Sequence, residues 1–169
     1  MGIGINGTLP WRLKYVCLLN LLLRPPHGSK ENQCCCNGRN TWDCIPLKYR
    51  PLIGRVNIVL THHVDDIQQK VPKGVVVVGS LQEAVKYIED REDIESTWVI
   101  GGSSVYKAAL SHPNCGKIYL TEIQKNFECD TFFPKFDREQ FKLVEEDGVP
   151  ADPQTEGDIT YYFRVYEKI

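Results

Sequence analysis

The chain has 169 residues, of which 42% are hydrophobic and 25% are charged, and its formal net charge is −2 at pH 7. This length and composition predict a soluble globular protein with a single domain that spans residues 1–169. The small net charge gives no reason to expect nucleic acid or an anionic membrane as a partner.

The sequence holds seven cysteines, which could indicate disulfide bonds. Their spacing argues against that interpretation, because Cys34, Cys35 and Cys36 are consecutive and the others are scattered singly. No Cys-x-x-Cys pair is present, so we expect no metal site. Reduced thiols in an intracellular protein are the simplest interpretation, and they predict a cytoplasmic location.

Residues 15–23 form an apolar run that follows Arg12 and Lys14, as in a signal peptide. Arg24, Pro25 and Pro26 come next, however, instead of a small-residue cleavage site. The run is also too short to span a bilayer, so we expect no membrane association.

The middle of the chain alternates predicted strands and helices. Residues 55–60 are rich in β-branched side chains and predict a strand. Residues 74–79 predict a second strand, which is apolar throughout and therefore covered on both faces. Ser80 then caps a helix, and Glu83 completes a capping box with it. This alternation indicates parallel βαβ units.

The second half of the chain continues the pattern and then changes it. Residues 95–97 predict a turn, and a buried strand at 98–100 is followed by a helix at 104–110. Further strands are expected at residues 117–123, 141–145 and 159–166. A polar loop at 148–158 joins the last two, which predicts an antiparallel hairpin. The fold class is therefore α/β, a mostly parallel central sheet with an antiparallel carboxyl-terminal edge hairpin.

The junction after residues 98–100 is a candidate phosphate site. Gly101 and Gly102 let the backbone approach a ligand closely. The N–H groups of the first helical turn, beside Ser103 and Ser104, suit a phosphate. A simple chain reversal is the alternative interpretation of this motif.

Two other segments agree with the interpretation of this junction as a phosphate site. Residues 2–11 read Gly-Ile-Gly-Ile-Asn-Gly-Thr-Leu-Pro-Trp, and residues 130–134 read Asp-Thr-Phe-Phe-Pro. In their order and separation, these two segments and residues 98–106 resemble the dihydrofolate reductase family. Trp42 and residues 50–55 fit the same family, and the resemblance covers nearly the whole chain. The resemblance implies a three-layer α/β sandwich, a monomer, and reduction of 7,8-dihydrofolate to 5,6,7,8-tetrahydrofolate by hydride transfer from NADPH.

The amino-terminal motif resembles the loop that closes over the cofactor in this family. Its glycines make a mobile lid plausible, although a surface turn is the alternative. The residues of this expected lid are Gly2, Ile3, Gly4, Ile5, Asn6, Gly7 and Thr8. Leu9 would contact substrate, and Trp11 resembles the tryptophan that positions a water beside the pterin; a core aromatic is its alternative role.

The resemblance also implies the residues that bind the cofactor. Arg39, Asn40 and Thr41 should open a helix near the phosphates. His62 stands where the family often has the arginine that reads the 2′-phosphate, and histidine carries less charge near neutral pH, so Arg39 could supply the missing charge. The remaining expected cofactor contacts are Thr61, His63, Gly101, Gly102, Ser103, Ser104, Val105 and Tyr106, with a cis peptide between the two glycines.

The expected substrate residues follow in the same way. Arg55 resembles the arginine that grips the α-carboxylate of the substrate's glutamate tail, because a guanidinium matches a carboxylate bidentately. Thr131 resembles the threonine that hydrogen-bonds the pterin amino group. Ile45, Pro46 and Ile100 would line the cleft, although apolar side chains at these positions could equally be core.

Residues 16–37 depart from the family pattern. Val16 stands at the position of the catalytic carboxylate, and Cys17 stands at the position of the pterin-facing aromatic. The tract has the family's length without its residues, and we interpret it as frame-shifted. The family's first strand, which lies centrally in the sheet before residue 2, is expected to be missing, leaving its neighbours with unpaired backbone groups.

Two other functions stay open. The chain could be a catalytically inactive NADPH- or folate-binding relative in which Val16 is the natural residue. It could also be a reductase of the riboflavin-pathway type, although Thr131 and Arg55 favour a folate with a glutamate tail.

Overall fold

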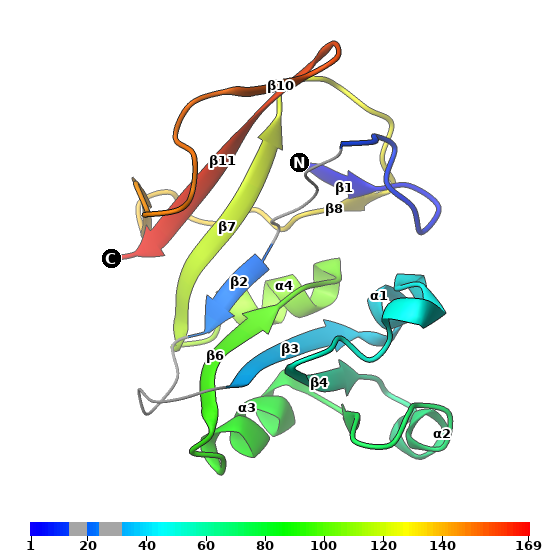
Figure 1. The fold of residues 1–169 in the computed structure, drawn as a ribbon. Helices are drawn as coiled ribbons and strands as arrows, with labels where there is room; N and C mark the ends of the chain where they lie inside the picture. The colour runs from blue at the N-terminus through cyan, green and yellow to red at the C-terminus, as the bar shows by residue number, and fades with distance from the viewer. Residues whose placement is uncertain (14–19, 24–31) are drawn as a thin grey trace.

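A computed structural model of the chain describes residues 1–13, 20–23 and 32–169, so Val16, Cys17 and the break at Pro25 lie outside the described residues. Figure 1 shows a twisted central sheet with helices beside it and a smaller sheet at the amino terminus. The central strands are β2 (Asn20–Leu23), β3 (Asn32–Gly38), β4 (Arg55–Leu60), β5 (Val76–Val78), β6 (Ile94–Val99), β7 (Cys115–Ile123), β9 (Phe141–Val144), β10 (Gln154–Glu156) and β11 (Ile159–Lys168).

The remaining elements are short. They comprise strands β1 (Gly2–Gly4) and β8 (Thr131–Phe132), helices α1 (Arg39–Cys44), α2 (Val64–Gln68), α3 (Leu81–Glu89) and α4 (Ser103–Leu110), and a 3₁₀ turn, η1 (Leu47–Tyr49). Within the described residues, every helix is too short or too polar to cross a bilayer. The sequence patterns did not predict α2 or η1.

The order of the central strands is β10-β11-β7-β2-β6-β3-β4-β5. Strand β9 pairs with residues 165–168 of β11, whereas β10 pairs with residues 159–161. Strand β3 pairs in parallel with β4 and β6, and β4 pairs in parallel with β5. Strand β11 runs antiparallel to β7, β9 and β10. The predicted α/β class, with an antiparallel carboxyl-terminal edge, is confirmed.

The centre of the sheet corrects one expectation. Strand β2 lies between β6 and β7 and pairs with both, Leu21 standing opposite Val99 on one side and Ile118 on the other. The neighbouring strands therefore do not keep the unpaired backbone groups that the sequence predicted there. Both pairings are antiparallel, so the interior of the sheet contains a reversed strand that the predicted parallel order did not include. Buried N–H and C=O groups need partners, and a strand of either direction supplies them.

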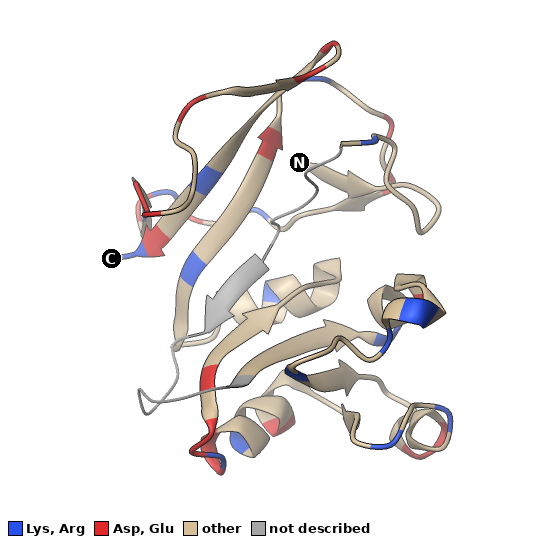
Figure 2. Ribbon diagram, viewed as in Figure 1, with Lys and Arg blue, Asp and Glu red and all other residues tan. Residues whose placement is uncertain are grey.

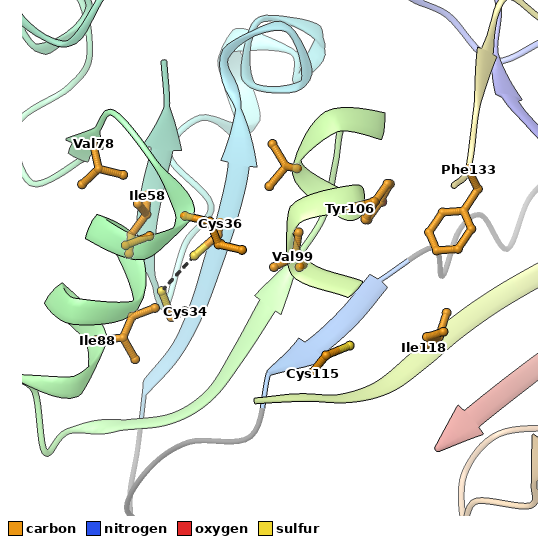
Figure 3. Close-up of a cluster of buried hydrophobic side chains, with 14 of the residues drawn as sticks. Cys34, Cys36, Ile58, Val78, Ile88, Val99, Tyr106, Cys115, Ile118 and Phe133 are labelled. Carbon is orange, nitrogen blue, oxygen red and sulfur yellow. Dashed lines mark hydrogen bonds between the residues drawn. The ribbon is translucent and has the colours of Figure 1, made fainter. Parts of the chain in front are cut away.

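The cysteine tract forms a regular interior strand. Residues Gln33 to Gly38 pair one for one with Arg55 to Leu60 of β4. Cys34 and Cys36 are fully buried on one face of β3, with their sulfur atoms 4.0 Å apart (Figure 3). Cys35 is also buried, on the other face. A free cysteine packs as a small apolar residue, so this tract fills the core although it departs from the family pattern.

The two faces of the sheet pack against different helices, because side chains alternate along a strand. On one face, Ile58 and Val78 pack with residues of α3 and α4. On the other face, Val59 packs with Trp42 of α1 and Ile67 of α2. The result is the expected three-layer arrangement of helices, sheet and helices.

The structure contradicts the turn predicted within β6 and keeps the cap predicted at the start of α3. The turn predicted at residues 95–97 is wrong, because Thr97 lies within β6, 1% exposed, and pairs with Cys34 of β3 and Leu23 of β2. The Ser80 cap of the predicted capping box is confirmed, because Ser80 Oγ accepts the Glu83 N–H at 3.2 Å. The Glu83 carboxylate accepts the Gly79 N–H at 2.9 Å, one residue before the position where this motif usually closes.

The burial of β3 predicts a pattern of thiol reactivity. Alkylation of the native protein should label the exposed Cys44 and spare Cys34, Cys35, Cys36 and Cys115. Burial raises the pKa of the Cys115 thiol to about 11, which keeps it protonated and unreactive at neutral pH. Peptide mass spectrometry after a short iodoacetamide pulse measures this, and the denatured chain serves as the control. Labelling of Cys34 as fast as Cys44 would contradict the buried strand.

Candidate active site

Two strand ends are held side by side at the carboxyl edge of the parallel strands. The Gly38 N–H at the end of β3 donates to Gly101 O at 2.8 Å, and the Ile100 N–H beyond β6 donates to Cys36 O at 3.0 Å. Helices α1 and α4 begin directly after these strands, so their amino termini are neighbours. The chain goes from β3 outward to β4 on one side, and β6 lies on the other. Such a switch point is where α/β sheets bind ligands.

The glycine pair makes this junction unusually close. The peptide between Gly101 and Gly102 is cis, as expected from the resemblance. Gly101 has a φ of +125°, and a Cβ there would lie 3.0 Å from Thr41 Oγ1. The N-cap residues of α4 and α1 are Gly102 and Gly38, which have no side chain to accept from the first-turn N–H groups. The N–H groups of both first turns can therefore face a ligand.

The segment of residues 2–8 forms a hairpin beside this junction. Ile5 and Thr8 exchange two backbone hydrogen bonds of 2.9 Å around Asn6 and Gly7. Both turn residues have positive φ, 49° and 71°, which is the type I′ geometry that Asn-Gly favours. At the tip, the Cys44 thiol donates to Gly7 O at 3.3 Å and ties the hairpin to the end of α1.

The base of the hairpin joins the other motif segments. Strand β1 pairs with β8, placing Gly4 opposite Thr131. Ser103 Oγ at the start of α4 donates to Phe132 O at 2.6 Å. The structure thus brings together residues 2–8, Ser103 and Thr131, which come from three of the segments that carry the family resemblance. Thr131 is half-buried at this point, while Ser104 is exposed.

The apolar candidates divide between solvent-accessible positions and the core. Val105 and Tyr106 are 6% and 3% exposed, and Tyr106 packs on Phe133, so both side chains belong to the core. The half-buried ring of Trp11 packs against Phe127 in a tilted arrangement, with 5.5 Å between ring centroids. The other candidates are accessible to solvent to different degrees: Ile45 and Ile100 are half-buried, and Leu9 and Pro46 are exposed.

The basic candidates for the cofactor lie on two neighbouring strand ends. Arg39 opens α1, and its Nε lies 3.3 Å from Asp43 Oδ2 in an exposed ion pair. Figure 2 shows basic positions of the backbone in blue on α1. Beyond β4, Thr61 is buried and its hydroxyl accepts the His63 N–H at 3.1 Å, whereas His62 and His63 are exposed. These side chains line the same edge of the sheet as the glycine pair. Asn40, exposed, and Thr41, half-buried, share the first turn of α1.

Arg55 lies at the opposite edge, where β4 begins. Strand β4 places it about 20 Å from the carboxyl edge at roughly 3.3 Å per residue. Its exposed side chain reaches back to Cys35, with 3.8 Å between Nη1 and Sγ. It lines a cavity of about 500 Å³ together with Lys48, Arg50 and Lys73, and the lining among the described residues includes no carboxylate. Such a set of cations suits an anionic group.

Asp130 also lies in this region, although the sequence motifs assign it no role. Its Oδ2 accepts the Asn6 N–H and its Oδ1 accepts the Thr131 hydroxyl, both at 2.8 Å. The Asn6 hydrogen bond, with that of Thr131, holds the pKa of this carboxyl below its usual range. Asp130 stands next to Thr131 in the motif, so the sequence offered its position but not its contact with residue 6.

Comparison with known proteins agrees with the arrangement. The family model of dihydrofolate reductase matches residues 1–168. The dihydrofolate reductase of Heliothis virescens is 62% identical over 173 residues, covering 100% of this chain and 92% of that protein. The enzyme of Sus scrofa is 42% identical over 176 residues, covering 99% and 92%.

A solved structure points the same way. The Schistosoma mansoni dihydrofolate reductase superposes with a TM-score of 0.69 at 34% identity, covering 87% of this chain and 79% of that one. The family match over nearly the whole length, these identities and the shared fold together show that the chain belongs to the dihydrofolate reductase family.

Proposed function

We propose that this protein reduces 7,8-dihydrofolate to 5,6,7,8-tetrahydrofolate with NADPH. The observation that carries the proposal is the meeting of the hairpin, Thr131 and the glycine pair at the switch point of the sheet. The family's cofactor is NADPH, which supplies the hydride when bound. The residues of this chain bind, orient and shield the reacting groups.

The donors at the carboxyl edge fit the phosphates of NADPH. The uncapped N–H groups of α1 and α4, with Thr41, Ser103 and Ser104, would hold the diphosphate. Arg39 and His62 would face the 2′-phosphate. Arg39 would supply most of the positive charge, although its guanidinium also pairs with the Asp43 carboxylate. Asn40, Thr61 and His63 complete this set. The hairpin of residues 2–8 would close over the nicotinamide and exclude water.

The substrate would run from the hairpin toward Arg55. Thr131 would hold the pterin amino group, Trp11 a water beside the ring, and Leu9, Ile45, Pro46 and Ile100 the flanks of the cleft. Arg55 would pair with the α-carboxylate of the glutamate tail, with the neighbouring cations of the cavity adding attraction. Val16 cannot deliver a proton, so we propose that water protonates the ring. Turnover would then be slower, by a factor of about 10²–10⁴, than with a carboxylic acid at this position.

We also propose that the protein is a cytoplasmic, single-domain monomer that needs no nucleic acid. The cysteines of the described residues are free thiols, which suits a reducing compartment.

The first test measures binding and turnover on the same preparation. NADPH should raise the melting temperature of the chain more than NADH does, and NADPH absorbance should fall slowly when dihydrofolate is added. Protection by NADPH without turnover would support a catalytically inactive relative instead. If NADPH gives no protection and no turnover is seen, the proposal is contradicted.

A second test addresses the tail carboxylate. Arg55→Lys should weaken binding of folate about tenfold, because the bidentate guanidinium contact is lost at a site that water partly screens. A pterin without a glutamate tail is the matched ligand control and should bind both proteins equally. Fluorescence titration measures both dissociation constants. Equal loss for both ligands would show that Arg55 acts on the fold and not on the tail.

A further inference from the structure

We propose that Asp130 is a positioning residue that fixes the polarity of the Thr131 hydroxyl and thereby makes the site select a ring amino group over a ring oxygen. The inference rests on the proposed function, which places Thr131 against the pteridine. Asp130 itself stays one residue away from that contact and acts through its neighbour.

The hydrogen bonds of Asp130 carry the argument. A threonine hydroxyl has one hydrogen to donate and two lone pairs to accept with. The Thr131 hydroxyl donates its hydrogen to Asp130 Oδ1 at 2.8 Å. Only its lone pairs remain for a ligand, so Thr131 can accept from an amino group but cannot donate to a carbonyl oxygen.

The second carboxylate oxygen fixes the first. Asp130 Oδ2 accepts the Asn6 N–H at 2.8 Å, and the Asp130 N–H donates to Gly4 O at 3.0 Å. The carboxylate is therefore held between the hairpin and Thr131 and cannot rotate away without losing a contact. The lowered pKa of Asp130 agrees with this, because an ionised carboxylate accepts on both oxygens at neutral pH. One side chain thus links the position of the lid to the polarity of the pterin contact.

The variant Asp130→Asn separates this role from simple bulk. Asn6 presents a backbone N–H, so the amide oxygen of the new side chain will turn toward it. The amide NH₂ then faces Thr131 and donates to its hydroxyl, which turns its own hydrogen toward the ligand. The variant keeps the size of the side chain and reverses the polarity that the ligand meets.

The experiment compares two probe ligands, pterin with its 2-amino group and lumazine with oxygen at that position. Fluorescence titration gives both dissociation constants for the wild type, Asp130→Asn, Thr131→Val and the double variant. The wild type should prefer pterin, and Asp130→Asn should lower that preference about tenfold, the value of one hydrogen bond to a charged group. In the Thr131→Val background the same change should have little effect, because Asp130 acts through the hydroxyl.

Asp137→Asn is the matched control, since Asp137 is also exposed and its Oδ1 accepts a backbone N–H, that of Glu139, at 2.8 Å. It should leave the preference unchanged. Hydrogen exchange at the Asn6 amide gives a readout without ligand. Exchange should quicken in Asp130→Asn, because the neutral amide oxygen that replaces the carboxylate accepts more weakly, and it should be unchanged in Thr131→Val and Asp137→Asn.

The outcomes separate the two proposals. An unchanged pterin preference in Asp130→Asn, or an equal loss with and without the Thr131 hydroxyl, would overturn the role of Asp130 alone. A wild-type chain that NADPH protects but that binds neither pteridine would overturn the proposed function.

Discussion

The pairing of β3 with β6 is the constraint on which the rest of the molecule depends. Two backbone hydrogen bonds join Gly38 to Gly101 and Ile100 to Cys36 and so fix where the two strands end. Because helices α1 and α4 start at those ends, their amino termini are forced to be neighbours. A shift of β6 by one residue would turn its side chains to the other face and move the glycine pair away from Thr41.

The interior of the sheet shows what the core demands and what it tolerates. Strand β2 pairs with β6 and β7 in the direction opposite to both, yet it satisfies backbone groups that would otherwise lack partners. The cysteines of β3 fill their places as small apolar side chains. Pairing and volume are strict requirements here, whereas strand direction and residue type are not.

This difference explains which features the sequence could predict. The strand at residues 55–60, the Ser80 cap and the glycine pair carry local signals that the structure keeps. Residues 95–97 look like a turn locally, but pairing with β3 and β2 outweighs that preference. The leucine and cysteine tracts have no alternating pattern, so their strands follow only from the gap they fill. The contact between Asp130 and Asn6 spans 124 positions, and no local signal encodes it.

A structure of the chain crystallised with NADPH and folate tests the central claim most directly. The diphosphate is predicted to lie against residues 39–41 and 101–104, with the pteridine beside Thr131 and the glutamate tail directed toward Arg55. Density for the diphosphate elsewhere on the sheet, or a pteridine remote from Thr131 and the hairpin, would contradict the account.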